Sequence, residues 1–276
     1  FQMSRLVQFL DLSPSMRPAI DAYAVNIDGF GQGVTPTIDL ARDDIEDVVR
    51  SAIRVERRLE AQRALLEDGK IVKVTPATPA EIKARVAELA EEMEDERQAI
   101  DAWMRRVAGD VTFTHLRKKT RVDLELTGNA YWEVRRNLLG QPVQINHVPA
   151  ASMLATSQGD EVQVKVKIHL TPITIAEDEQ SRRFRKYLQM NGNAKPVYFK
   201  EHGDRRLMSA QSGVYYETTQ AMAKDEPKAT AATEIRHFKI PTPQSEVYGV
   251  PRWAGCMAGL TGARNAEETN CLYFTN

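Results

Sequence analysis

Residues 235–276 read IRHFKIPTPQSEVYGVPRWAGCMAGLTGARNAEETNCLYFTN, and this stretch decides how the last part of the chain folds. A strand-like run comes first, and a turn that contains Pro241 and Pro243 follows it. The hexamer YGVPRW at 248–253 marks the start of a helix, which is predicted to run over 253–276. The segment therefore predicts a strand, a proline-rich turn and a long helix in that order.

The predicted helix at 253–276 contains several small residues. Gly255, Gly259 and Gly262 lie in its first half, although each glycine inside a helix costs roughly 1 kcal/mol relative to alanine. Gly255 and Gly259 share a face, which favours close approach of another helix. Because Glu267 and Glu268 follow almost at once, the membrane version of this packing is excluded.

A second informative block, TGNAYWEVRRNLLGQPVQINHVP, occupies residues 127–149. Its pattern predicts a change from helix to strand, with strands at 127–134 and 143–147. Leu139, Gly140 and Gln141 form the turn between them. The block therefore predicts a hairpin that directly follows a helix.

Taken together, the two blocks resemble the portal proteins of tailed bacteriophages, notably the type named after the PBSX prophage. The similar features are the GNAY transition at 128–131, the YG-x-P-R entry at 248–252 and the F-x-N end at 274–276. This resemblance implies an α+β fold, with a portal wing domain of helices around short antiparallel strands over residues 1–250. Residues 251–276 would begin the first stem helix, and the clip, tunnel loop and crown are expected to be absent from this chain.

The same resemblance implies a structural role without catalysis or cofactors. Family members form a ring, usually of twelve subunits, at the unique vertex of the capsid in the virion, after assembly in the host cytoplasm. The ring contacts the major capsid protein, the terminase and the head–tail connector proteins, and double-stranded DNA passes through it without sequence-specific binding. Gly255, Gly259 and Gly262 would then pack neighbouring stem helices. Glu267 and Glu268 would face the channel or a neighbour, and a solvated turn is an equally weighted alternative.

The composition indicates that the chain does not bind nucleic acid through an overall excess of positive charge. The 276 residues include 37 basic and 38 acidic side chains, which gives a net charge of -1. Tight DNA-binding proteins usually carry a clear basic excess. One concentrated basic run, at 117–121, lacks interleaved aromatic residues. It therefore favours a solvated helix face or a salt bridge between subunits over a nucleic-acid site.

No feature of the sequence predicts a membrane protein or a secreted one. The opening residues are too interrupted for a signal peptide, and no apolar run approaches the roughly 20 residues needed to span a bilayer. Cys256 and Cys271 lie on one predicted helix, more than ~20 Å apart, which is beyond disulfide reach. We therefore expect free thiols in a reducing compartment.

Hydrophobic periodicity predicts the remaining elements. Helices are expected at 13–24, 43–66, 79–107 and 111–129, with Gly29, Gly31 and Gly33 ending the first and Thr78 capping the third. Strands are expected at 161–170, 196–201 and 214–218, a short surface helix within 173–188, and a mobile loop at 219–233.

The apolar seam of the helix at 79–107 leaves two interpretations open. Packing within its own domain is favoured, since single seams of this kind are common inside domains. A coiled-coil partner is the alternative, and the chain would then be a helical scaffold or adaptor that forms a dimer and no ring.

Enzyme motifs are not indicated. The five histidines do not pair at metal-ligand spacing, and the sequence contains no Walker lysine motif, Gly-x-Ser-x-Gly elbow or HExxH. His202 and Asp204 form a candidate acid/base pair, but a turn explains them better, and His237 is expected to be packed or solvent-facing. A soluble hydrolase would need a clustered His, Asp and Glu pocket. No catalytic, cofactor-binding or metal-binding residue is therefore predicted.

Overall fold

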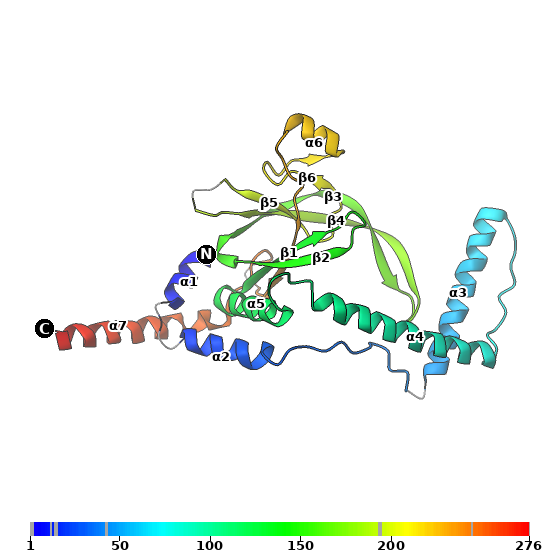
Figure 1. Cartoon of the computed structure of the whole chain (residues 1–276), viewed down its shortest axis with the longest axis horizontal. Helices are drawn as coiled ribbons and strands as arrows, with labels where there is room; N and C mark the ends of the chain where they lie inside the picture. Colours follow the sequence, from blue (N-terminus) through cyan, green and yellow to red (C-terminus); the bar gives the residue numbers. More distant parts are fainter. Residues whose placement is uncertain are drawn as a thin grey trace. The chain divides into compact units, whose positions relative to one another are not determined.

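The computed structural model describes residues 3–11, 13, 16–41, 44–192, 195–243 and 245–275, and the side chains at 9–11 and 68 are excluded from the description. It contains helices and strands, and it divides into two compact units (Figure 1). The first unit comprises Phe1–Gln32, Met104–Asp160 and Arg183–Asn276, and the second comprises Gly33–Trp103 and Glu161–Arg182. The expected division between residues 1–250 and 251–276 remains a prediction.

A sheet with the strand order β2-β1-β8-β5-β4-β3 connects distant parts of the sequence. Its strands are β1 (Asn129–Arg136), β2 (Pro142–Val148), β3 (Met153–His169), β4 (Ile175–Gln189), β5 (Val197–Glu201) and β8 (Glu234–Lys239). The predicted hairpin is confirmed, because β1 pairs antiparallel with β2. On its other side β1 pairs antiparallel with β8, with Tyr131 opposite His237. The strand-like run of the last segment thus lies in the sheet beside the hairpin.

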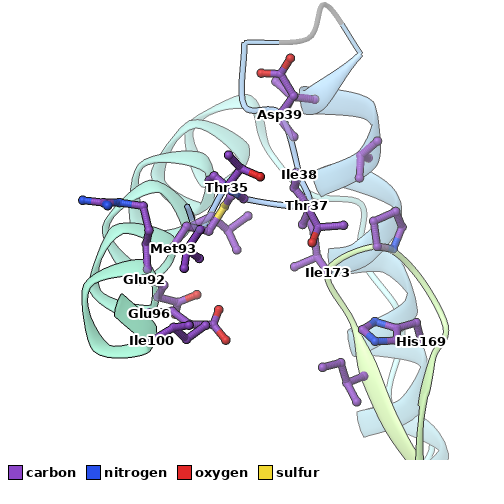
Figure 2. A pocket seen from close by; sticks show the side chains of 18 of the residues that line it. Thr35, Thr37, Ile38, Asp39, Glu92, Met93, Glu96, Ile100, His169 and Ile173 are labelled. Atoms are coloured by element: carbon purple, nitrogen blue, oxygen red, sulfur yellow. The ribbon is translucent and has the colours of Figure 1, made fainter. Parts of the chain in front are cut away.

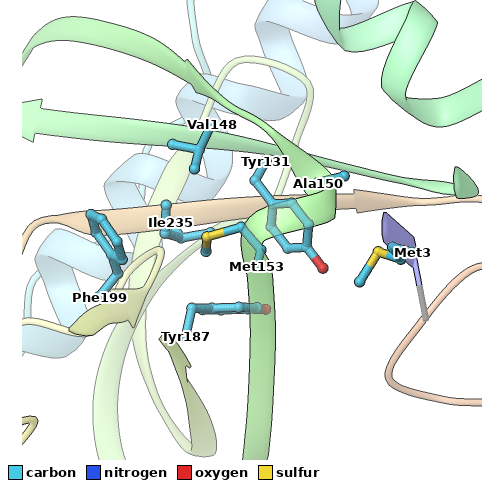
Figure 3. Packing of buried hydrophobic residues seen from close by; sticks show 8 residues of the cluster. All are labelled: Met3, Tyr131, Val148, Ala150, Met153, Tyr187, Phe199 and Ile235. Atoms are coloured by element: carbon cyan, nitrogen blue, oxygen red, sulfur yellow. The ribbon is translucent and has the colours of Figure 1, made fainter. Parts of the chain in front are cut away.

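The core of the first unit lies against this sheet. Figure 3 shows Tyr131, Met153, Tyr187, Phe199 and Ile235 gathered from five strands, and Met3 of helix α1 (Met3–Asp11) completes the cluster. Tyr131 and Ile235 have no exposed surface. Helix α1 was not predicted.

Helices α2 (Met16–Asp28) and α5 (Phe113–Thr127) cover a second apolar cluster, which consists of Leu6, Ile20, Leu126 and Trp253. The hydroxyl of Thr112 caps α5 by accepting from the backbone N–H of His115, 3.2 Å away. Both helices lie close to their predicted ranges. Pro14, which was expected to start α2, lies outside the described residues.

The second unit is built around α3 (Ile45–Asp68) and α4 (Pro79–Met104). Val49 of α3 packs against Ile82 and Leu89 of α4, so the first half of the predicted seam is buried within the chain. Thr78 caps α4 as predicted, because its hydroxyl accepts from the backbone N–H of Glu81 at 3.3 Å. In return, the backbone N–H of Thr78 donates to the Glu81 carboxylate at 2.6 Å. Asp43, the predicted start of α3, lies outside the described residues.

Two predicted elements are wrong. The segment 173–188 forms strand β4 instead of a surface helix, because main-chain pairing with β5 and β3 overrides its local charge pattern. Within the expected loop at 219–233, helix α6 (Thr219–Asp225) forms, since Thr218 caps it and Met222 is buried beneath it. It follows the short strands β6 (Leu207–Met208) and β7 (Tyr215–Tyr216).

Other boundaries move by a few residues. Helix α4 ends at Met104, and Val107, predicted as part of its seam, is fully buried with its carbonyl accepting from the N–H of Ile145 at 2.7 Å. The final helix begins as a 3-10 turn, η2 (Arg252–Cys256), and continues as α7 (Met257–Thr275). Gly255 therefore lies before the α-helix, and the predicted last residue, Asn276, lies outside the described residues.

Candidate functional site

The candidate site is the junction at which the two informative sequence blocks meet. Asn129, at the start of β1, is fully buried. Its Oδ1 accepts from the backbone N–H of Gly249 at 2.7 Å, and its Nδ2 donates to the carbonyl oxygen of Gly249 at 3.0 Å. Nδ2 also donates to the carbonyl oxygen of Thr127 at 2.9 Å. One side chain therefore satisfies both backbone polar groups of a residue 120 positions away.

Two glycines allow the backbones to approach this closely. Gly128 ends α5 with a positive φ of 77°, and a Cβ there would lie 2.5 Å from the carbonyl carbon of Val250. A Cβ on Gly249 would lie 2.2 Å from the carbonyl oxygen of Gly128 and 2.6 Å from that of Ile240. Because these atoms belong to the backbone, they cannot rotate away. Glycine is thus required at position 128 in the first block and at position 249 in the second for the same reason: the two backbones approach too closely for a side chain.

His237 of β8 completes the junction. Its ring stacks on Tyr131 with 4.4 Å between the ring centroids, and its Nε2 lies 3.0 Å from Oδ1 of Asn129. Burial, with smaller contributions from Lys239 and Arg185, lowers the pKa of His237 to about 4. The ring is therefore neutral at pH 7, and Nε2–H donates to Asn129. Of the two expected environments, packed or solvent-facing, the imidazole thus has the packed one.

The start of the final helix is attached to the same unit by aromatic side chains. The hydroxyl of Tyr248 accepts from the N–H of Ala155 at 2.7 Å. Trp253 is buried, and its Nε1 donates to the carbonyl oxygen of Glu125 at 2.9 Å. Arg252 lies 3.4 Å from the Glu125 carboxylate. The base of α7 is thus held by β3, by α5 and by the Asn129 junction.

The predicted packing residues of α7 lie on its exposed side. Leu260 packs against the Trp253 cluster, whereas Gly259 and Gly262 are exposed. A Cβ on Gly255, Gly259 or Gly262 would meet nothing within 4 Å. At about 100° per residue, Gly259 and Gly262 point away from the side that carries Leu260. This small-residue surface is therefore open to another molecule.

The acidic pair and the end of α7 are also exposed. Glu268 pairs with Arg264 at 3.1 Å along the helix, and Glu267 is exposed beside it. Leu272, Tyr273 and Phe274 are 65%, 79% and 84% exposed. Figure 1 shows α7 (red) extending away from strand β1. The two cysteines predicted as free thiols, Cys256 and Cys271, are both free and exposed.

The basic run at 117–121 has a role that the sequence did not indicate. Arg117 and Arg121 lie 2.6 and 2.9 Å from the two carboxylate oxygens of Asp28, whose side chain is buried. The run therefore joins α5 to α2 inside the chain, instead of forming only a solvated face or a bridge between subunits. The sequence did not indicate this role for Asp28, because Arg117 lies 89 residues away along the chain.

The candidate acid/base residues have different partners. Nδ1 of His202 lies 3.1 Å from Glu234, whereas Asp204 accepts from Arg206 and from the hydroxyl of Tyr215. Burial would raise the pKa of Glu234, but hydrogen bonds from His202 and Arg136 lower it to about 2. Asp204 is thus ion-paired with Arg206, and His202 lies beside Glu234, so both residues belong to a turn after β5, as the sequence favoured.

Within the part of the chain that the structure describes, no group of three or more His, Cys, Asp or Glu side chains is placed to hold a metal ion. In the same residues, none of the helices combines the length and the apolar character that crossing a bilayer requires.

Sequence comparison identifies relatives of this chain. It is 30% identical over 274 residues to the phage-like element PBSX protein XkdE of Bacillus subtilis (strain 168), covering 99% of this chain and 45% of the relative. It is 27% identical to the uncharacterized protein YqbA of the same organism, covering 99% and 44%. The chain therefore spans a little less than half the length of these relatives. It is a relative of a phage-element protein.

Other comparisons are weaker. No protein-family model matches the chain. Among solved structures, a chain in the virion of a native gene transfer agent particle is 13% identical, with a TM-score of 0.34 over 92% of this chain and 51% of that one. A chain in the neck of an empty gene transfer agent particle is 12% identical, with a TM-score of 0.35 over 91% and 50%. TM-scores this low do not establish a shared arrangement.

Proposed function

We propose that this chain is part of a phage portal protein, a ring-forming structural subunit at the unique vertex of the capsid. In this role the ring forms the channel for DNA packaging and ejection. It also provides the docking site for the terminase and the head–tail connector proteins. The chain itself contributes structure and no catalysis, and its place is in the virion.

The observation that carries this proposal is the Asn129 junction. The two blocks that resemble portal proteins lie 120 residues apart in sequence and are joined here by a buried pair of hydrogen bonds. The alignment with XkdE covers 99% of the chain and so includes both blocks. The name of XkdE assigns that protein to the PBSX element, and PBSX is also the type of portal that the sequence resembles.

The shape of α7 supports a packing role. Its base is rigidly held through Trp253, while Gly259 and Gly262 present a surface with room for another backbone. Neighbouring copies of α7 packed on this surface would bring helix axes close together, since small residues permit short distances between helices. In this arrangement Gly255, Gly259 and Gly262 are the packing residues of the stem.

The acidic pair suits a channel through which DNA slides. Glu267 and Glu268 would repel phosphates, whereas each phosphate neutralised by Lys or Arg strengthens a salt-dependent attachment. Glu268 is partly offset by Arg264, so Glu267 is the stronger candidate for the channel side. The near-neutral net charge of the chain agrees with a surface that does not hold DNA tightly.

A helical scaffold or adaptor without a ring is the second candidate. The observation that favours it is the far end of the α4 seam, where Ile100 remains 37% exposed and available to a partner helix. The first part of the seam is less available, because Ile82 and Leu89 are buried against Val49. The adaptor would form dimers.

Native mass spectrometry and negative-stain images of the full gene product distinguish the two candidates. Rings of about twelve subunits with a central hole are expected for a portal. A stable monomer or dimer under the same conditions would contradict the portal proposal and favour the adaptor.

A further inference from the structure

The second unit contains an open groove with apolar walls and a volume of about 840 Å³. It is enclosed by residues 34–39, the start of α3, the second half of α4 and the turn between β3 and β4. Figure 2 shows Met93 and Ile100 on the α4 wall, with Ile38 and Ile173 on the opposite side. The groove is therefore shaped for an apolar segment and not for a compact polar ligand.

Acidic side chains surround this apolar floor. Asp39, Asp44, Glu92 and Glu96 all line the groove, and Glu96 is exposed to solvent. Arg97 is the cationic side chain among the groove-lining residues, and it is paired with Glu94 at 2.6 Å along its own helix. Glu92 is itself 3.3 Å from Arg85, so its charge is partly offset. The remaining balance is negative, which favours an occupant with basic side chains.

The same unit carries a segment with the complementary chemistry. Residues 70–74 read KIVKV, follow Glu67 and Asp68 at the end of α3, and lie outside any helix or strand. Ile71 is 92% exposed, Val72 51% and Val74 37%. Two lysines and three β-branched apolar residues in five positions make this segment extended and basic, with an exposed apolar surface.

This segment is held away from its own groove. Arg57 of α3 donates to the carbonyl oxygen of Thr75 at 3.0 Å, so the segment runs back beside the second half of α3. Figure 1 shows that half of α3 (cyan) extending away from α4 as an arm, whereas the groove lies at the start of α3. The arm and the groove are therefore two separate surfaces on one chain.

We propose that residues 70–74 of one copy occupy the groove of the next copy, and this inference rests on the proposed ring. Ile71 and Val72 would enter between Met93 and Ile173, and Lys73 would lie against Glu96. Because the two surfaces differ, the contact is head-to-tail, the type of contact that forms a ring when its rotation closes. It adds a second contact between subunits at a distance from the helix stem.

Site-specific photo-cross-linking of the full gene product tests this contact. A benzoylphenylalanine in place of Ile71 is expected to give a covalent ladder on a denaturing gel, with cross-linked peptides from residues 89–100 or 169–175. The same group in place of Leu138, which is fully exposed in the first unit, serves as the control and should not reach those peptides. A cross-link that joins residue 71 only to its own subunit, or only to another virion protein, would overturn the inference.

Charge exchange provides the second measurement. Lys73→Glu and Glu96→Lys should each lower ring formation about tenfold, and combining them should restore most of it. Lys83→Glu and Glu91→Lys change exposed charges of α4 outside the groove and should leave assembly unchanged. If the unaltered protein forms rings but the combined variant does not regain them, this contact is rejected and the portal proposal stands. Single variants that assemble normally would also reject the contact. Absence of rings in the unaltered protein would reject both.

Discussion

Asn129 makes two hydrogen bonds to Gly249, one to its backbone N–H and one to its carbonyl oxygen, across 120 residues of sequence. Both residues are buried, so water cannot replace either bond. The contact connects the end of α5 and the start of β1 to the base of the final helix. Together with the hydrogen bonds of Tyr248 and Trp253, this contact fixes the direction in which α7 leaves the sheet.

Replacing Asn129 with alanine should destabilise the chain by about 2–4 kcal/mol. The substitution leaves the N–H and carbonyl of Gly249 without these partners in a buried place, where each unsatisfied group costs about 1–3 kcal/mol. The measurement is urea unfolding followed by circular dichroism. Asn265→Ala on the exposed side of α7 is the control, with an expected change within about 0.5 kcal/mol. Equal effects of the two substitutions would contradict the role of the junction.

Two glycine-to-alanine substitutions should have opposite effects. Gly249→Ala places a Cβ 2.2 Å from the backbone oxygen of Gly128, so we expect a loss of more than about 3 kcal/mol or failure to fold. Gly262→Ala meets nothing within 4 Å and should stabilise the isolated chain by about 0.5–1 kcal/mol. Thermal unfolding of both variants checks the pair. A tolerated alanine at 249 would be inconsistent with the described approach of the two backbones.

Acid should weaken the junction through His237. Burial, with Lys239 and Arg185, lowers the pKa of His237 to about 4, whereas an unfolded histidine has a pKa of about 6.5. The unfolded state therefore binds the proton first, and stability present above pH 6.5 is lost as the pH falls towards 4. The full shift corresponds to a loss of about 2 kcal/mol between pH 7.5 and pH 5, so with partial solvent screening we expect a loss of about 1–2 kcal/mol.

The pH effect is measured as the urea midpoint at several pH values in that range. Glu234, with a pKa of about 2, contributes its own loss below pH 4.5 and so falls outside the window. His237→Gln keeps a donor towards Asn129 and removes the titration. Its stability should therefore change less with pH, and an unchanged slope would assign the effect to other groups.

The glycine surface of α7 should matter for assembly and not for folding. Gly259→Leu with Gly262→Leu fills space that is open within one chain, so the unfolding midpoint of the isolated chain should not fall. In the full gene product the same change should reduce the ring population at least tenfold, measured by native mass spectrometry. Thr261→Leu, at an exposed neighbouring position, is the matched control. Rings that tolerate both leucines would remove these glycines from the subunit interface.

Local patterns predicted those elements whose signals lie within a few residues. Thr78 and Glu81 make the capping box that starts α4, and Gly128 adopts the positive φ that ends α5. Segments with mixed signals were predicted less well. The charged run in β4 indicated a helix, and only pairing with β5 shows that Tyr187 and Phe199 lie opposite each other.

The candidate site was predicted only in part. Both blocks were recognised, but nothing in either block indicated that Asn129 reaches Gly249. One usable signal was present, since asparagine is uncommon in strands and a buried Asn at the first position of β1 must find polar partners. The pairing of Asp28 with Arg117 and Arg121 had no such signal, because each charge alone is typical of a solvated helix.

The sequence by itself determined the approximate ranges of α2, α3, α4, α5 and α7, the hairpin, the near-neutral charge and the small-residue composition of the last helix. Each of these depends on propensity, capping or periodicity, which act over a few neighbouring residues. Only the tertiary structure decided that the two blocks share one junction, that Gly259 and Gly262 face away from their own domain, and that an apolar groove lies apart from the arm at 70–74. These features depend on which buried polar groups and apolar surfaces meet across more than a hundred residues, and short-range patterns do not carry that information.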